Sequence, residues 1–289
     1  MILGQEHKDS KRMINALTID LEPWYASEFL TKYLPKEKDD QIEEAVRPIL
    51  DLLDRYKTKA TFFVLGIVAE RHPEMVRQVY DKGHEIASHA YSHKTLYELG
   101  ESRFEEEIKR SVELLSSITS KKPVGFRAPS FSINNSTKWA FRILEENGFR
   151  YDSSIFPIKT MLYGVPNAPL RRYRPSMADV AQENPDGRII EFPVTVFKLG
   201  RNIPIAGGFY LRVLPLWFLR FAIARVNKTR PAVIYVHPWE TYSKTPRLSG
   251  VPLFSRFITY CGINSALRKL EGLLKEFEFK PLCEFLEKV

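Results

Sequence analysis

The sequence predicts a single α/β domain in which parallel strands alternate with the helices that cover them. Three observations lead to this fold class. Short apolar runs are separated by stretches whose apolar residues recur at helical spacing. Residues suited to catalysis follow the carboxyl ends of these runs, where a barrel of this class gathers its active site. The 289 residues, 44% of them hydrophobic, suffice for one large core without a second domain.

The first half of the chain carries the clearest elements. Buried strands are expected at 13–22, 60–65, 84–88 and 125–127. Helical spacing predicts helices at 41–56, 73–82 and 102–117. Gly83 is suited to cap the end of the second helix, and Ser102, with Glu105 three residues later, is suited to open the third. Residues 24–40 show no periodicity and are expected to form a loop or lid near the site.

The second half continues the alternation with a long interruption. Strands are expected at 149–152, 188–194 and 232–237, and helices at 137–146 and 214–226. The stretch 155–187 is rich in Pro and Arg and lacks periodicity, so we expect an excursion over one rim of the fold.

The formal charge of +8 and the isoelectric point near 9.3 would suit an acidic polymer, a nucleic acid or an anionic membrane. The basic residues, however, are scattered in pairs such as Lys121-Lys122 and Arg171-Arg172, interleaved with acids, which is typical of a solvated surface. No Gly-rich nucleotide signature and no zinc-finger Cys pattern occurs. We therefore expect no nucleic-acid partner.

The sequence also bears on the compartment. Its longest apolar segment, 211–226, contains three arginines and is shorter than the ~20 residues that span a bilayer, although a peripheral membrane contact stays open for it. Residues 1–12 are polar, unlike a secretory signal, and are expected to be disordered or extended. Cys261 and Cys283 imply no disulfide framework. The expectation is a cytoplasmic protein without a transmembrane segment.

Two histidines four residues apart, His89 and His93, follow the predicted strand at 84–88. On one helical turn this spacing places both rings on the same face, and neutral imidazole is a common ligand of Zn²⁺ and similar ions. At the end of the first strand, Asp20 and Glu22 share a face because strand side chains alternate. Two carboxylates so close repel one another unless a cation or a proton intervenes.

Taken together, Asp20, Ser88-His89-x3-His93, Phe126-Arg127-x-Pro129 and Val236-His237 resemble, in this order, the motifs of the polysaccharide deacetylase family (NodB homology, carbohydrate esterase 4). The resemblance covers about residues 13–240. It implies a distorted (β/α)7 TIM-like barrel, here a single domain over 13–289 with a C-terminal helical extension. Gly-Gly-Phe-Tyr at 207–210 and Tyr-Asp-Ser-Ser at 151–154 are similar to a branch found among exopolysaccharide-synthesis proteins.

The resemblance implies roles for the metal and the base. His89 and His93 would hold Zn²⁺ or another divalent transition metal, and Asp20 would be the general base, oriented by a bidentate contact with Arg127. The family commonly carries a metal-binding aspartate directly after the base, where this sequence has Leu21. Glu22, on the same face as Asp20, is the expected replacement.

The remaining roles follow in the same way. His237 would be the general acid, with Asp152 as the expected partner of its second nitrogen and Glu191 as the rival. The backbone N–H of Ser130 would help to bind the oxyanion. Five aromatic residues that lie near motif residues in the sequence are candidates for a sugar platform, or alternatively for pocket walls: Trp24, Tyr91, Phe131, Tyr210 and Trp239.

The expected function is hydrolysis of the acetamide of an N-acetylated amino sugar in a polysaccharide or its lipid-linked precursor. Two alternatives remain open. One is a barrel amidohydrolase acting on a small cyclic amide or ureide. The other is a carbohydrate-binding protein whose catalysis has decayed, because Leu21 interrupts the usual acid pair. The sequence leaves the oligomeric state open.

Overall fold

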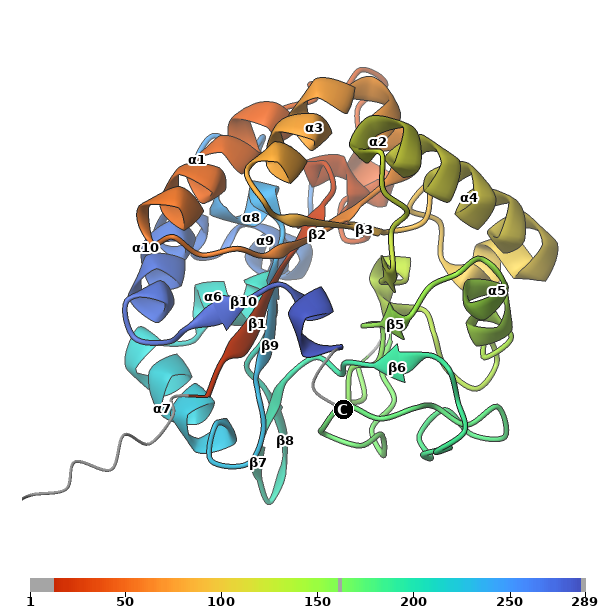
Figure 1. Cartoon of the computed structure of the whole chain (residues 1–289). Coiled ribbons are helices and arrows are strands. Elements are labelled where there is room, and N and C mark those ends of the chain that lie inside the picture. The colour runs from red at the N-terminus through yellow and green to blue at the C-terminus, as the bar shows by residue number, and fades with distance from the viewer. Residues whose placement is uncertain (1–12, 161–162, 287–289) are drawn as a thin grey trace, which may run out of the picture.

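A computed structural model describes residues 13–160 and 163–286 and shows a curled parallel sheet with helices packed around its outer face (Figure 1). Strands follow one another across the sheet in the order β9, β1, β2, β3, β4, β5, β6, and β10 pairs with the start of β1. Their bounds are Asn15–Leu21 (β1), Thr61–Val64 (β2), Glu85–Ser88 (β3), Gly125–Phe126 (β4), Tyr151–Asp152 (β5), Ile190–Glu191 (β6), Val233–Val236 (β9) and Phe279–Lys280 (β10). The predicted α/β class, the distorted barrel and the single domain are confirmed.

Helices cover the sheet because each presents an apolar stripe to it. In α1, for example, Ile42, Val46, Ile49 and Leu53 are buried at helical spacing, while the acids between them stay exposed. The helices are Ile42–Arg55 (α1), Gly66–Arg71 (α2), Pro73–Asp81 (α3), Leu96–Thr119 (α4), Ala140–Glu146 (α5), Gly208–Val213 (α6), Leu216–Val226 (α7), Pro238–Thr241 (α8), Leu253–Tyr260 (α9) and Ile263–Leu274 (α10). The last two follow α8 in the chain, and α10 packs against α6 and α8.

The sheet is open between β6 and β9, where an antiparallel hairpin intervenes. It pairs β7 (Val196–Leu199) with β8 (Arg201–Pro204) around Gly200, whose φ of 68° suits glycine. Just before the hairpin, the Thr195 backbone N–H donates to the Val233 carbonyl and the Thr195 hydroxyl accepts from the Val233 N–H. These two bonds tie the segment after β6 to β9. The hairpin was not predicted, because its residues lack a continuous apolar run.

Several predicted boundaries were wrong. Helix α4 begins at Leu96 rather than Ser102, because Thr95 and Glu98 form the capping box there. Gly100, with φ 67° and ψ 176°, kinks the helix just before the predicted start. Strand β6 covers only two of the seven residues expected at 188–194. The apolar segment 211–226 is not continuous, since α6 and α7 are separated at Pro215. The prediction for residues 1–12 lies outside the described residues.

In the part of the chain that the structure describes, no helix is long and apolar enough to cross a bilayer. Cys261 and Cys283 are both free. The carboxyl ends of β1, β3, β4 and β9 meet at one end of the barrel. That end carries the site described next.

Candidate active site

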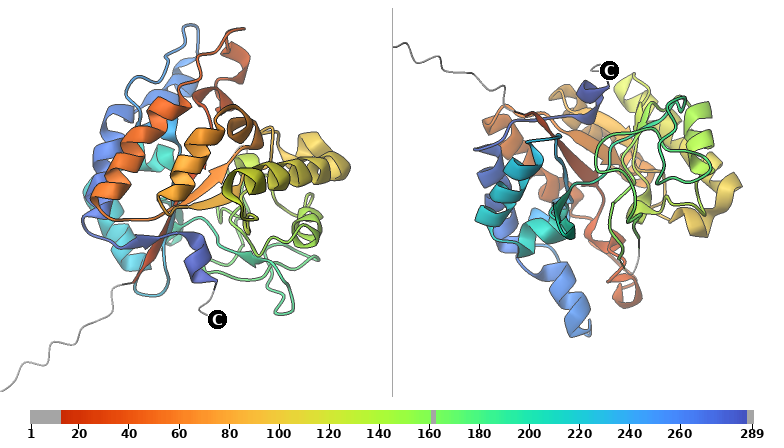
Figure 2. Two further views of the ribbon diagram at one scale, coloured as in Figure 1. Left: turned by 45° about the horizontal axis from the view of Figure 1, so that its top comes forward. Right: turned by 90° about the horizontal axis from the view of Figure 1, so that it is seen from below.

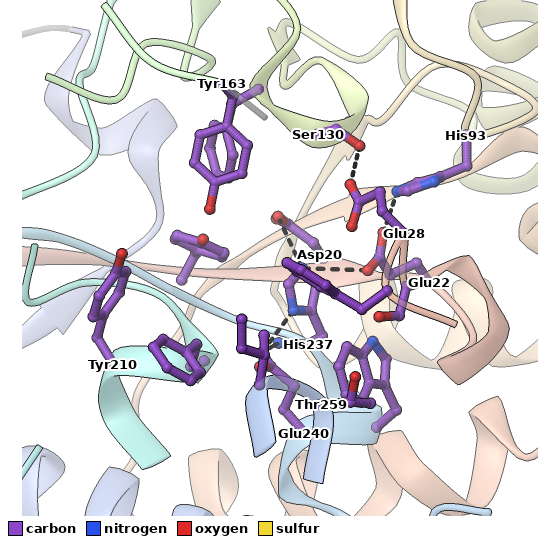
Figure 3. Close-up of a pocket in the computed structure, with 18 of the residues that line it drawn as sticks. Asp20, Glu22, Glu28, His93, Ser130, Tyr163, Tyr210, His237, Glu240 and Thr259 are labelled. Atoms are coloured by element: carbon purple, nitrogen blue, oxygen red, sulfur yellow. Dashed lines mark hydrogen bonds and ion pairs between the residues drawn. The ribbon is translucent and has the colours of Figure 1, made fainter. Parts of the chain in front are cut away.

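Glu22, His89 and His93 converge at the carboxyl ends of β1 and β3. One ligand atom from each lies within 4.8 Å of the others, and the described residues contain no further group of this kind. Figure 3 shows the Glu22 carboxylate and the His93 ring pointing toward one another. The expected pleat at the end of β1 brings this about, because Asp20 and Glu22 face the pocket while Leu21 is fully buried in the core on the other side.

The two histidines do not lie on a helical turn, as the spacing had suggested. His89 directly follows β3, and its backbone N–H donates to the Val64 carbonyl of the neighbouring strand. The chain then turns through Ala90 and His93, both with φ near +60°. This left-handed turn, rather than helix geometry, returns His93 to the site.

The His89 ring is held in one tautomer. Its Nδ1 lies 2.7 Å from the Arg127 carbonyl, which accepts the Nδ1–H. Nε2 then presents its lone pair toward Glu22, the arrangement that metal-ligating histidines adopt.

The Glu22 carboxylate is buried, and one of its oxygens has no hydrogen-bond partner in the described residues. That oxygen, Oε2, lies 2.6 Å from His93 Nε2 and 3.7 Å from His89 Nε2. Burial would raise the pKa of Glu22, but the positive charges of His237 and His93 hold it well below its ordinary value. Two imidazoles and one ionised carboxylate in a buried niche fit a divalent transition ion such as Zn²⁺, with further positions left for water and substrate.

Asp20 lies beside this cluster and is held by Arg127. Arg127 Nη1 donates to Asp20 Oδ1 at 2.6 Å, and Asp20 Oδ2 lies 3.8 Å from His237 Nε2. The contact has one hydrogen bond, which corrects the expected bidentate pair, because Nε and Nη2 of Arg127 bond Ser153 instead. The guanidinium is fully buried and stacks 4.3 Å from the centre of the Phe63 ring.

His237 completes the site from the end of β9, but its partner is neither Asp152 nor Glu191. Its Nδ1 lies 2.6 Å from Glu240 Oε2, three residues along the chain. Burial opposes the charged ring, yet Glu22 and Glu240 raise the pKa of His237 to about 10. The Trp239 ring stacks on the imidazole with an interplanar angle of 12°. The raised pKa favours the protonated form of the His237 ring, which can donate a proton.

Glu240 is itself buried and held by Arg212 of α6. Burial would raise its pKa, but the charges of His237 and Arg212 lower it, and Arg212 Nη2 lies 2.8 Å from Glu240 Oε1. Gly208 makes room for the carboxylate, since a Cβ there would fall 1.4 Å from Glu240 Oε2. The sequence did contain a signal for Glu240. His237-Pro238 opens a short helix, and an acid at its third position reaches back to the residue that caps it.

Asp152 and Glu191 lie at the ends of β5 and β6 and support the Arg127 loop instead. The Ser154 hydroxyl lies 2.5 Å from Asp152 Oδ1, and the same hydroxyl accepts the Ala128 N–H at 2.7 Å. Glu191 Oε1 accepts the Ile155 N–H at 3.0 Å. Burial, and then the nearby Asp152 charge, raise the pKa of Glu191 well above its ordinary value. The raised pKa favours the protonated form of Glu191, and no hydrogen bond or ion pair joins either acid to His237 in the described residues.

The pocket above these residues is a cavity of ≈260 Å³ whose wall includes Ser130 and Glu28. Ser130 has φ 52° and its hydroxyl donates to the exposed Glu28 carboxylate (Figure 3). Glu28 belongs to the 24–40 segment, which was expected to lie near the site. Aromatic side chains from α6 and α9, Phe209, Tyr210 and Phe254, form the outer wall.

Trp24 and Tyr91, expected as a sugar platform, do not line this cavity. Trp24 is 3% exposed, packs in a cluster with Trp239 and Tyr260, and donates its Nε1–H to the Asp39 carbonyl. Tyr91 turns toward α2 and α4, where its hydroxyl donates to Glu70 and its ring lies under Arg110. Proximity in sequence to motif residues misled both assignments.

Two family models divide the chain. Residues 12–151 match the model described as polysaccharide deacetylase, and residues 153–287 match a domain of unknown function, DUF3473. The division falls in β5, inside one barrel, so the site draws on both halves. The first half carries Asp20, Glu22, His89, His93 and Arg127, and the second carries the pair His237 and Glu240.

Curated relatives match only part of the chain. A peptidoglycan deacetylase of Helicobacter pylori is 29% identical over 153 residues, which is 50% of this chain and 50% of that protein. A peptidoglycan-N-acetylglucosamine deacetylase of Bacillus cereus is 38% identical over 93 residues, 32% of this chain and 34% of the relative. The chain thus spans about half or less of the length of these relatives.

Among solved structures, a candidate polysaccharide deacetylase from Mycobacterium smegmatis has the same fold. The two superpose with a TM-score of 0.60 at 23% identity, over 98% of this chain and 91% of the other.

Proposed function

Since this chain belongs to the polysaccharide deacetylase family, we propose that it is a metal-dependent N-deacetylase that hydrolyses the acetamide of an N-acetylated amino sugar. The observation that carries the proposal is the convergence, at one end of the barrel, of a three-residue ligand set, a carboxylate held by an arginine, and a protonated histidine. Hydrolysis of an amide by a metal-activated water uses all three functions.

A divalent ion held by Glu22, His89 and His93 would supply Lewis acidity, polarising the acetyl carbonyl and lowering the pKa of an attacking water. The ligands fit that role because the buried Glu22 Oε2 lies 2.6 Å from His93 Nε2 and 3.7 Å from His89 Nε2, and His89 is fixed in the tautomer that leaves Nε2 free. Zn²⁺ suits two imidazoles and a carboxylate.

Asp20 is the group placed to take the proton of the attacking water. Arg127 binds its Oδ1, which leaves Oδ2 directed at His237 and the pocket. The guanidinium, which is always charged, orients the carboxylate. Its single hydrogen bond to Asp20 suffices, because Ser153 and the aromatic rings fix the guanidinium on its other sides.

His237 donates a proton to the amine as the C–N bond breaks. Glu240 accepts the Nδ1–H, so that Nε2 is the nitrogen facing Asp20 and Glu22. The backbone N–H of Ser130, a residue of the pocket wall with a left-handed φ of 52°, is the donor we propose for the oxyanion, since the next two N–H groups already bond the Ala128 and Pro129 carbonyls.

The substrate class we propose is an N-acetylated glycan: a polysaccharide such as peptidoglycan, or a lipid-linked precursor of an exopolysaccharide. Peptidoglycan is the substrate named for the curated relatives. The exopolysaccharide alternative rests on Gly-Gly-Phe-Tyr at 207–210 and Tyr-Asp-Ser-Ser at 151–154. In this structure both motifs support the catalytic residues, Gly208 by admitting Glu240 and Ser153 by binding Arg127.

Metal analysis of the purified protein, combined with acetate release from N-acetylated glycans, tests the proposal. We expect about one equivalent of bound transition metal and acetate release that a chelator abolishes. The panel contains chitooligosaccharides, peptidoglycan fragments and a cyclic ureide. Bound metal with turnover of the ureide alone would replace the proposal with the small-amide hydrolase. The absence of both metal and turnover would point to a carbohydrate-binding protein.

A further inference from the structure

The positive charge of this protein is concentrated in one part of the chain. Residues 192–270 contain twelve Lys and Arg residues and a single acid, Glu240, which is buried against His237 and Arg212. The rest of the chain has more acidic than basic residues. Basic and acidic residues were expected to be interleaved over the surface, but residues 192–270 depart from that pattern.

The same part of the chain carries most of the exposed large apolar side chains. Six of the ten in the described residues belong to it: Leu199, Trp217, Phe221, Leu253, Phe254 and Phe257. Three of these lie on α9, where Leu253 is 83%, Phe254 60% and Phe257 53% exposed. The opposite side of this helix is anchored through Thr259 and Tyr260, which are buried. The buried side of α9 is already packed against the protein, so its exposed apolar face is expected to bind an apolar partner.

Helix α9 stands at the mouth of the pocket. In Figure 2, right, it projects from one end of the molecule, beside the red segment 24–40. Phe254 lines the cavity and its ring contacts Phe29 of that segment, while Phe257 contacts Phe209 of the cavity wall. Whatever covers α9 therefore lies next to the entrance of the active site.

The bases around α9 indicate the charge of its partner. Arg256 is an exposed base on α9 itself, and the exposed Lys244 and Arg247 lie in the segment that leads into it, where Arg247 sits over the Tyr260 ring. No ion pair joins these three bases to an acid in the described chain. An exposed apolar helix face in a segment of uncompensated bases matches the chemistry of an anionic lipid surface, where hydrocarbon lies beneath negative headgroups. A protein partner would have to supply an equally apolar and acidic groove.

We propose that α9 is an interfacial helix that docks the mouth of the pocket on an anionic membrane, with Leu253, Phe254 and Phe257 in the headgroup region. The docking does not rest on the proposed deacetylation. It would present the pocket to acetylated sugars that are held at the membrane by a lipid anchor. The peripheral contact expected for 211–226 is a separate prediction: Leu211 and Arg212 of that segment are buried, whereas Trp217 and Phe221 are exposed.

Co-sedimentation with lipid vesicles tests this inference. The full chain is expected to bind phosphatidylcholine vesicles that contain phosphatidylglycerol, to bind pure phosphatidylcholine vesicles less, and to dissociate as NaCl is raised. The double variant Leu253→Ser/Phe257→Ser should bind the anionic vesicles at least about tenfold more weakly. Neither residue lines the cavity, so acetate release from a soluble chitooligosaccharide should be unchanged in this variant.

Met177→Ser is the matched control, since Met177 is a 45% exposed apolar residue outside the basic segment, and this variant should bind vesicles like the wild type. The inference is overturned if the wild type ignores anionic vesicles or if the double variant binds them equally well. It is also overturned if the double substitution converts a dimer to a monomer while neither form binds lipid, because a second copy would then cover α9. Vesicle binding is measured without turnover, so its outcome is separate from that of the deacetylase test.

Discussion

Two acidic pairs lie at strand ends of the same sheet, and their surroundings give them opposite character. Asp20 and Glu22 at the end of β1 face Arg127, His89, His93 and His237, and positive charge holds the pKa of Glu22 low. Asp152 and Glu191, at the ends of β5 and β6, face one another and backbone or hydroxyl donors, and burial raises the pKa of Glu191. The first pair can bind a cation and accept a proton, whereas the second can only hold a proton of its own.

The comparison shows that a carboxylate at the carboxyl end of a barrel strand is not functional by position alone. Asp152 was expected to act on His237 because of its place in the motif order. In the structure the partner of His237 is Glu240. The Arg212 guanidinium binds Glu240, and Gly208 leaves room for its carboxylate. The cations around an acid, more than its place on a strand, separate catalytic from supporting carboxylates.

The largest difference is expected from making the same substitution in both pairs. Glu22→Gln removes a charged ligand and should strip the metal and lower acetate release more than ~100-fold, since outer-shell partners alone are worth about 10- to 100-fold. Glu191→Gln should keep the metal and retain most of the activity, because glutamine resembles the protonated acid. Metal content and acetate release are measured on both variants. Equal metal occupancy in the two would remove the distinction between the pairs.

Within the first pair, Asp20→Asn should separate metal binding from turnover. Asparagine retains an oxygen for Arg127 but cannot accept the proton of water, so the metal stays while the rate falls by about 10²- to 10⁴-fold. Metal analysis and kcat are the two readouts. If Asp20→Asn lost the metal and Glu22→Gln kept both metal and rate, Asp20 would be the ligand and the assignments would be reversed.

The partner of His237 is tested by comparing Glu240→Gln with Asp152→Asn. Glutamine at 240 removes the charge that helps to raise the pKa of His237, so the alkaline limb of the pH–rate profile, where His237 loses its proton, should move to lower pH and kcat should fall about 10- to 100-fold. Asp152→Asn should leave that limb in place, because Asp152 does not contact the ring. A shift of the limb in the Asp152 variant instead would restore the original assignment.

The smallest effect is expected on stability. Because the pKa of Glu191 is raised in the folded state, its contribution to stability is complete below the unfolded value near 4.5 and is lost as pH rises toward the folded value. Glu191→Gln does not titrate, so its free energy of unfolding should exceed that of the wild type increasingly as pH rises from 5 to 8, by an amount on the order of 1 kcal/mol. Urea unfolding at several pH values measures this difference. If Glu191→Gln instead became less stable relative to the wild type as pH rises, Glu191 would be ionised in the folded protein.

The sequence by itself determined the elements whose signal is local. The α/β class was predicted from the apolar runs of β1, β2, β3 and β9 and from the helical spacing of α1 and α3. These signals are local because a buried strand or helix face requires apolar residues at a regular spacing along the sequence. Alternation along β1 likewise predicted that Asp20 and Glu22 face the same side. His89 and His93 were found by their spacing, although the turn that joins them is left-handed rather than helical.

Tertiary structure decided the contacts between distant elements. No periodicity links Arg212 to Glu240, or Asp152 to Glu191, since these pairs depend on strand register and on which helix covers which strand end. Trp24 and Tyr91 show the same limit, because a residue next to a motif points into the pocket or away from it according to the path of its loop. The assignment of each acid to a metal, a histidine or another acid is therefore set by packing, which brings charges together that the sequence keeps apart.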